Sequence, residues 1–106
     1  MPLIKKNTLA LLLMCCLGAT AMASQDLAQK KACMNCHGID KAVLGPALKD
    51  VAKKYRGQQG SEARLAEKVI KGGGGVWKMP MGPMPAQTQV TPNEAKQLVT
   101  WIMKLN

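Results

Sequence analysis

One five-residue motif constrains this chain more than any other feature. Cys33-Met34-Asn35-Cys36-His37 sets two thiols on adjacent turns at a helix end, with an imidazole directly after them. This spacing is the attachment signature of a c-type haem, because two such thiols can add to the two vinyl groups of one porphyrin. A zinc site would need four ligands, and thioredoxin-like chemistry would need a βαβ context. The motif therefore predicts one covalent haem c on Cys33 and Cys36, with His37 as an axial iron ligand.

The first 23 residues have the features of an export signal. Two lysines precede an unbroken apolar run over residues 9–17, and Ala21-Met22-Ala23 supplies a small-x-small cleavage site. A retained membrane anchor is the rival interpretation, but the apolar run is too short to span a bilayer. We therefore expect a signal peptide over residues 1–23, export to the periplasm, and one mature domain over residues 24–106.

Composition indicates what such a domain needs. Without the signal peptide the chain has 83 residues, 13 basic and 6 acidic side chains, no Phe, two Trp and one Tyr. Small domains with so few aromatic side chains usually depend on a metal, a covalent cross-link or a cofactor to complete the core. Export excludes nucleic acid as a partner. The scattered lysines form either a solvated face or a surface that steers acidic partners.

Helical periodicity recurs along the chain without any alternating strand pattern, so the predicted fold class is all-α. The first helix is expected from about Gln25 to Cys36, capped by Ser24 or Asp26. Pro46 is expected at the first position of a second helix, which ends before Arg56. A third helix is expected from Ser61 to the glycines at 72–75. In the last helix Thr91 is the cap, Pro92 the first residue, and Glu94 completes a capping box.

A loop rich in methionine and proline precedes the last helix. His37 is the only histidine of the chain, so two histidines from one chain cannot both bind the iron. The sixth ligand is then a methionine, a lysine, or absent. Met34 lies between the two cysteines, and Met103 fits core packing in the last helix. The remaining candidates are Met79, Met81 and Met84, of which Met79 lies only two residues after Trp77.

Together these residues resemble the small bacterial class I cytochromes c, in particular the electron donors to nitrite reductase of denitrifiers and the carriers of ammonia oxidisers. The resemblance rests on the haem motif, Gly45-Pro46-Ala47, Gly75-Val76-Trp77, a Met-Pro pair and the last helix with Trp101. It implies four short helices around one haem, with the axial methionine in a Met-Pro segment before the last helix. Met84-Pro85 fits best, although it lies about two residues later than usual, and Met81 is the runner-up.

The resemblance also implies roles around the ligands. The carbonyl of Pro46 would accept a hydrogen bond from His37, and Trp77 would donate its indole N–H to a haem propionate. Helix initiation is the alternative role for Pro46, and core packing is the alternative for Trp77. Trp101 is expected in the core between the first and last helices.

The expected function is one-electron, outer-sphere transfer by a six-coordinate His/Met haem, without enzymatic activity. The alternative is a haem enzyme or gas sensor with a labile sixth ligand. The resemblance implies a monomer that exchanges electrons with respiratory proteins. The donor would be a membrane cytochrome complex, and the acceptor a nitrite reductase, peroxidase or terminal oxidase. No stable membrane insertion of the mature chain is expected. The candidate steering lysines are Lys41, Lys49, Lys53, Lys54 and Lys78.

Overall fold

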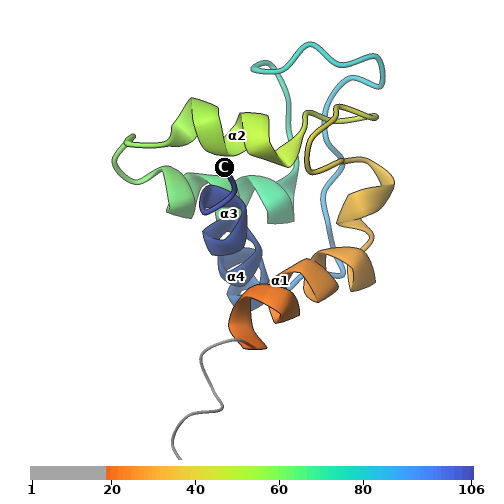
Figure 1. Ribbon diagram of the computed structural model, residues 1–106. Coiled ribbons are helices and arrows are strands. Elements are labelled where there is room, and N and C mark those ends of the chain that lie inside the picture. Colours follow the sequence, from red (N-terminus) through yellow and green to blue (C-terminus); the bar gives the residue numbers. More distant parts are fainter. Residues whose placement is uncertain (1–18) are drawn as a thin grey trace, which may run out of the picture.

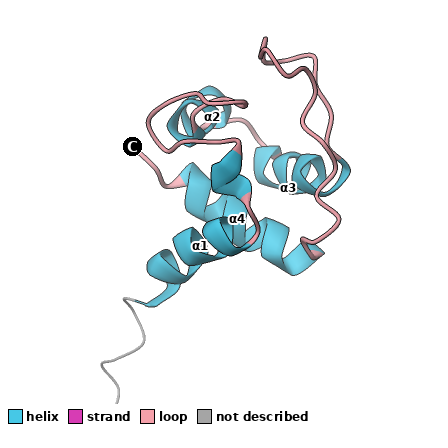
Figure 2. Cartoon of the chain, turned by 90° about the vertical axis from the view of Figure 1, so that its right-hand side faces the viewer, coloured by secondary structure: helices cyan, strands magenta, loops and turns pink. Residues whose placement is uncertain are grey.

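The computed structural model describes residues 19–106, and it confirms the all-α prediction for this part of the chain. In chain order the elements are α1 (Ala19–Lys30), a short 3-10 helix η1 (Cys33–Asn35), α2 (Leu48–Tyr55), α3 (Ser61–Lys71) and α4 (Pro92–Met103). Loops join them, and no strand forms among the described residues (Figure 2). The predicted signal peptide lies mostly outside these residues.

Helix α4 is the centre of the fold, and it packs against α1, α2 and α3 (Figure 1). Its N-terminus is fixed as the sequence predicts. The hydroxyl of Thr91 accepts a hydrogen bond from the backbone N–H of Glu94 at 3.2 Å, and the Glu94 carboxylate accepts one from the Thr91 N–H at 3.0 Å. Two of the N–H groups that a helix leaves unpaired at its start are thereby satisfied.

The first helix differs from the prediction at both ends. It already includes Ala19, so Ser24 and Asp26 lie inside α1 and not at its cap. It ends at Lys30, because Ala32 adopts a left-handed backbone with φ 65°. That conformation cannot continue a right-handed helix, and the chain restarts as η1, which carries Cys33. The haem motif therefore lies on a separate short helix and on the turn that follows.

The second helix begins two residues later than predicted. Pro46 precedes Ala47, the residue that caps α2, so it is not the first helical residue. The first N–H groups of α2 are satisfied from another direction: Leu48 donates to the Gly38 carbonyl at 2.9 Å and Lys49 to the Ile39 carbonyl at 3.1 Å. The loop after His37 thus caps α2, which leaves the carbonyl of Pro46 available to a side chain. The predicted start of α3 at Ser61 and its end before Gly72 are confirmed.

The core is made mostly of small and aliphatic side chains. Its buried members are Ala28, Leu48, Ala66, Val90, Ala95, Leu98, Val99 and Trp101. Leu98 and Val99 are the largest side chains that are almost fully buried. Trp101 packs in this core, as expected, and it also lines a cavity. No helix in the described part of the chain is long and apolar enough to cross a bilayer.

Candidate functional site

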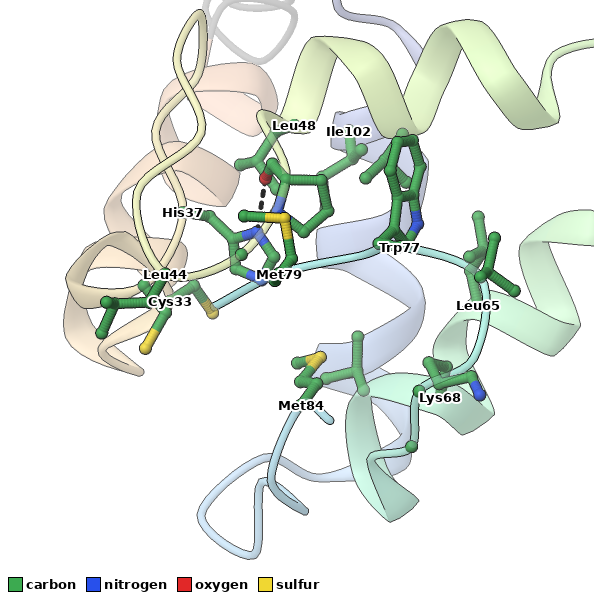
Figure 3. A pocket seen from close by; sticks show the side chains of 18 of the residues that line it. Cys33, His37, Leu44, Leu48, Leu65, Lys68, Trp77, Met79, Met84 and Ile102 are labelled. Atoms are coloured by element: carbon green, nitrogen blue, oxygen red, sulfur yellow. Dashed lines mark hydrogen bonds between the residues drawn. The ribbon is translucent and has the colours of Figure 1, made fainter. Parts of the chain in front are cut away.

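A cavity of about 430 Å³ lies between η1, the α1–α4 core and the loop that follows α3 (Figure 3). Cys33, Cys36 and His37 line one side of it, and the methionines of the loop line another. Most other lining residues are apolar, among them Leu48, Val51, Leu65, Val69, Leu98, Val99 and Ile102. A cavity of this size and character is typical of a site for an apolar organic group, with a few polar atoms that fix its orientation.

The two cysteines line this cavity as free thiols, and no disulfide joins them. The turn that carries them is fixed by backbone hydrogen bonds from Cys36 N and His37 N to the Cys33 carbonyl, at 3.2 and 3.0 Å. Partial burial raises the pKa of the Cys33 thiol, which favours the protonated form. Both thiols lie half-buried beside the same cavity, as attachment to one porphyrin requires.

His37 is oriented by the chain that follows it. Its Nδ1 lies 2.7 Å from the carbonyl oxygen of Pro46, the hydrogen bond that the resemblance implies. Because a carbonyl can only accept, Nδ1 carries the proton, and Nε2 keeps its lone pair for a metal. Gly45 lies against the face of the ring: a Cβ at this position would be 2.6 Å from Cε1 of His37. The Gly45-Pro46 pair therefore both admits and orients the imidazole.

The three loop methionines all line the cavity but are held differently. Met84 is half-buried, and it pairs with Gly73 in both directions: Met84 N donates to Gly73 O at 3.0 Å, and Gly73 N donates to Met84 O at 2.9 Å. Met79 is also half-buried. Met81, the runner-up from the sequence, is 67% exposed. Gly72, with φ +71°, lets the loop pass close by, since a Cβ there would lie 2.7 Å from Ala86 N.

Trp77 lines the cavity near α2, where the Nζ of Lys54 lies 5.5 Å from the centre of its ring. Lys68 is the one charged side chain among the residues that line the cavity, and sequence reasoning missed it. The pattern of α3 could have indicated it, because Lys68 is one turn after Leu65 and directly before Val69, at the exposed edge of the inner face. The positive charges of Lys54 and Lys68 suit an anionic group, such as a propionate, at this end of the cavity.

Comparison with known proteins agrees with this geometry. The family model described as Cytochrome c matches residues 21–106. The chain belongs to the cytochrome c family. It is 52% identical over 82 residues to cytochrome c2 of Rhodocyclus tenuis, a match that covers 74% of this chain and 88% of that protein. Identity to cytochrome c-551 of Pseudomonas aeruginosa is 42% over 87 residues, or 81% of this chain and 80% of the relative.

Solved structures of cytochromes c have the same fold. The crystal structure of Nitrosomonas europaea cytochrome c552 superposes with a TM-score of 0.73 at 41% identity, covering 77% of this chain and 99% of that one. As a small cytochrome c, the chain is an electron carrier with one covalently attached haem c. The residues around the cavity fit that group: paired thiols, an oriented imidazole, thioethers and an apolar lining occur together.

Proposed function

We propose that this cytochrome c is an exported, one-electron carrier in which the haem iron is bound by His37 and Met84. One observation carries the proposal: the cavity is lined by a preoriented imidazole and two thiols on one side and by a thioether from a fixed loop on another. Cys33 and Cys36 would hold the porphyrin through thioether bonds. When bound, haem c supplies an iron that takes up and releases a single electron.

His37 acts through a lone pair that its surroundings keep available. The hydrogen bond from Nδ1 to Pro46 fixes the tautomer and limits rotation of the ring, and such bonds increase the basicity of a ligating imidazole. Gly45 keeps the ring in position from one face. The residues of this side therefore need little rearrangement when the iron changes its charge.

Met84 is the best supported of the three thioethers as the native ligand. Its backbone is paired with Gly73, just after the end of α3, and Pro85, the next residue, restricts the backbone of Met84. A ligand on a segment of this kind loses little conformational entropy on binding. Methionine sulfur as partner of histidine favours the reduced iron and raises the potential. With both axial positions filled by protein, no position is left for a substrate, so electron transfer is outer-sphere and the protein is not an enzyme.

Trp77 would donate its indole N–H to a haem propionate, with Lys54 above its ring. Of the other candidate steering lysines, Lys41, Lys53 and Lys78 are exposed. Lys49 is partly engaged, because its Nζ lies 2.5 Å from the Asp40 carboxylate. We propose that the exposed cations bring acidic faces of redox proteins to this carrier, and that cleavage after Ala23 releases the mature protein into the periplasm.

The proposal is tested on the protein purified from the exported fraction. We expect a mass equal to residues 24–106 plus one haem, and low-spin absorption spectra in both oxidation states that do not change under carbon monoxide. The ferric spectrum should contain the weak far-red band of a thioether-bound iron. A high-spin spectrum, or rapid binding of carbon monoxide, would instead assign the protein to enzymes or gas sensors with a labile sixth ligand.

A further inference from the structure

Met79 lies in the cavity in spite of its short distance from Trp77 along the chain. Figure 3 shows Met79 and Met84 both directed into the cavity that contains the ring of His37. Both side chains are half-buried, whereas Met81 is 67% exposed. Two residues after Trp77 are therefore enough to bring a thioether to the site. In this structure Met79 is thus more buried at the cavity than Met81, the runner-up from the sequence.

Met79 and Met84 have the same residue type after them but different backbone hydrogen bonds. Each is followed by a proline, Pro80 or Pro85, which fixes one backbone angle and stiffens the segment. Met84 is tied to Gly73 by two backbone hydrogen bonds. The carbonyl of Met79 accepts one hydrogen bond, from Gly82 N at 3.0 Å, in a turn that ends at Gly82, whose φ is +77°. The turn around Met79 is therefore a separate unit from the Gly73–Met84 pair.

This separation allows one methionine to move without the other. The loop between Gly73 and Met84 is largely exposed: Val76 is 53% exposed, and Pro80, Gly82 and Pro83 are exposed as well. A shift of the turn would therefore displace no buried core residue. A ligand that is tethered so near the site has a high effective concentration there, in the millimolar range or above for short linkers.

We propose that Met79 is a second thioether ligand for the haem iron, which takes the axial position when the Met84 thioether is missing. The inference rests on the proposed function, since it assumes that Met84 is the native ligand. Met84 holds the position in the intact protein because its segment is anchored to α3. Met79 replaces it from the same cavity, so the iron keeps a His/Met pair. The competing nitrogen ligand from the cavity wall is Lys68.

The test uses holoprotein with carbon-13 in the methionine methyl groups. A methyl group held directly over the iron lies in the porphyrin ring current, and in the ferrous protein it resonates far upfield of all other methionine methyls. Leucine is the replacement at each site, because it keeps the apolar volume but cannot ligate. In Met84→Leu we expect the native upfield methyl signal to be replaced by a new one, and the ferric far-red band to persist.

Four further variants identify the source of the new signal. Met79→Leu and Met81→Leu alone should keep the native signal, and Met84→Leu with Met81→Leu should keep the new one. Met84→Leu with Met79→Leu should have neither, and it should bind added imidazole at least about tenfold more tightly than Met84→Leu does, since an internal ligand that fills nine-tenths of the sites lowers apparent affinity by that factor. Far-ultraviolet circular dichroism of each holoprotein checks that the variant is folded.

The possible failures are distinguishable. Loss of every upfield methyl signal in Met84→Leu, with a high-spin or amine-ligated iron, would overturn the role of Met79 and leave Met84 as the ligand. A new signal that disappears when Met81 is also replaced would overturn it in favour of Met81. A native signal that survives in Met84→Leu would show that Met84 is not the native ligand, and the proposed function would need revision.

Discussion

The orientation of His37 depends on a hydrogen-bond acceptor and on the absence of a side chain next to its ring. Pro46 supplies a carbonyl 2.7 Å from Nδ1, and Gly45 supplies space against the ring. The backbone at Gly45 cannot easily withdraw, because its N–H donates to the Cys36 carbonyl at 2.8 Å. One residue without a side chain therefore controls the orientation of the proposed metal ligand.

Gly45→Ala should accordingly destabilise the holoprotein by about 1–3 kcal/mol, the usual cost of overpacking a well-filled site. The added Cβ would meet Cε1 of His37 at 2.6 Å. The measurement is denaturant unfolding followed by haem absorbance. Gly74→Ala is the control, since its Cβ would come no closer than 3.2 Å to Pro83. Equal stability losses in the two variants would contradict the proposed control of His37 by Gly45.

Trp77 contacts the Lys54 ammonium through its ring and is proposed to donate a hydrogen bond to a haem propionate, and substitution can separate the two interactions. Trp77→Phe removes the indole N–H together with the stronger cation–π partner, whereas Lys54→Met removes the cation alone. We expect a loss of about 1.5–3 kcal/mol from a hydrogen bond to a charged group in Trp77→Phe. For Lys54→Met the expected loss is about 0.5–1 kcal/mol. Thermal unfolding of the two holoproteins measures both values, and equal losses would assign Trp77 to packing alone.

At this scale the motif residues could be predicted from the sequence, because their chemistry is encoded in consecutive positions. The environment of each methionine could not. How deeply Met79 and Met81 are buried at the cavity depends on the turn closed by Gly82 N and the Met79 carbonyl, a contact that residue spacing does not determine. The carbonyl of Pro46 reaches His37 because the proline precedes α2, which the sequence pattern placed inside the helix.

Among the elements, α4 combines the strongest sequence signals with the central position in the fold. Its capping box also makes its stability depend on pH. The N–H of Thr91 donates to the Glu94 carboxylate and lowers the pKa of Glu94 below its ordinary value of 4.5, with Lys31 contributing from the turn after α1. The unfolded chain therefore takes up this proton first as the pH falls. The contribution of the Glu94 carboxylate to the free energy of unfolding is complete above pH 4.5, and it is lost as the pH falls through the lowered pKa of Glu94.

Glu94→Gln should therefore flatten the acid side of the stability profile. Glutamine can keep the capping geometry, but it has no charge to lose. We expect the difference in unfolding free energy between the natural protein and the variant to shrink as the pH falls below 4.5. Urea unfolding at a series of pH values measures this. Glu62→Gln, which removes the same charge from an exposed position of α3, is the control. A difference that stays constant with pH would contradict the argument.

Helix positions were predictable where local signals act alone. Thr91, Pro92 and Glu94 determine the start of α4, and Ser61 and Gly72 bound α3. The prediction was wrong at the end of the first helix and at the start of the second. Ala32 breaks the first helix although alanine favours helices, and α2 begins only where the carbonyls of Gly38 and Ile39 can cap it. Both exceptions serve the site, since they position Cys33 and free the carbonyl of Pro46.

At the scale of the whole molecule, the cavity occupies a place that large buried side chains fill in other small domains. Few large residues of the described chain are fully buried, and α2, α3 and α4 each direct apolar side chains at the cavity. Burial of apolar surface is the main stabilising contribution in a domain of this size. Without a group in the cavity, these faces would lack much of their apolar contact.

We therefore expect the variant that carries both Cys33→Ala and Cys36→Ala to be largely unfolded after export. The single variant Cys33→Ala retains one attachment thiol and should remain mostly folded with haem. Far-ultraviolet circular dichroism and cooperative urea unfolding compare the two. A double variant with cooperative unfolding and native-like stability would show that the helices pack without the cofactor.

The central claim is that the iron keeps the same two protein ligands while it exchanges one electron. A spectroelectrochemical titration of the mature holoprotein tests this most directly. We predict one reversible, one-electron transition, with low-spin spectra at both ends and the far-red thioether band rising and falling with the ferric fraction. Hysteresis between the oxidative and reductive titrations, or a high-spin spectrum at either end, would contradict the claim.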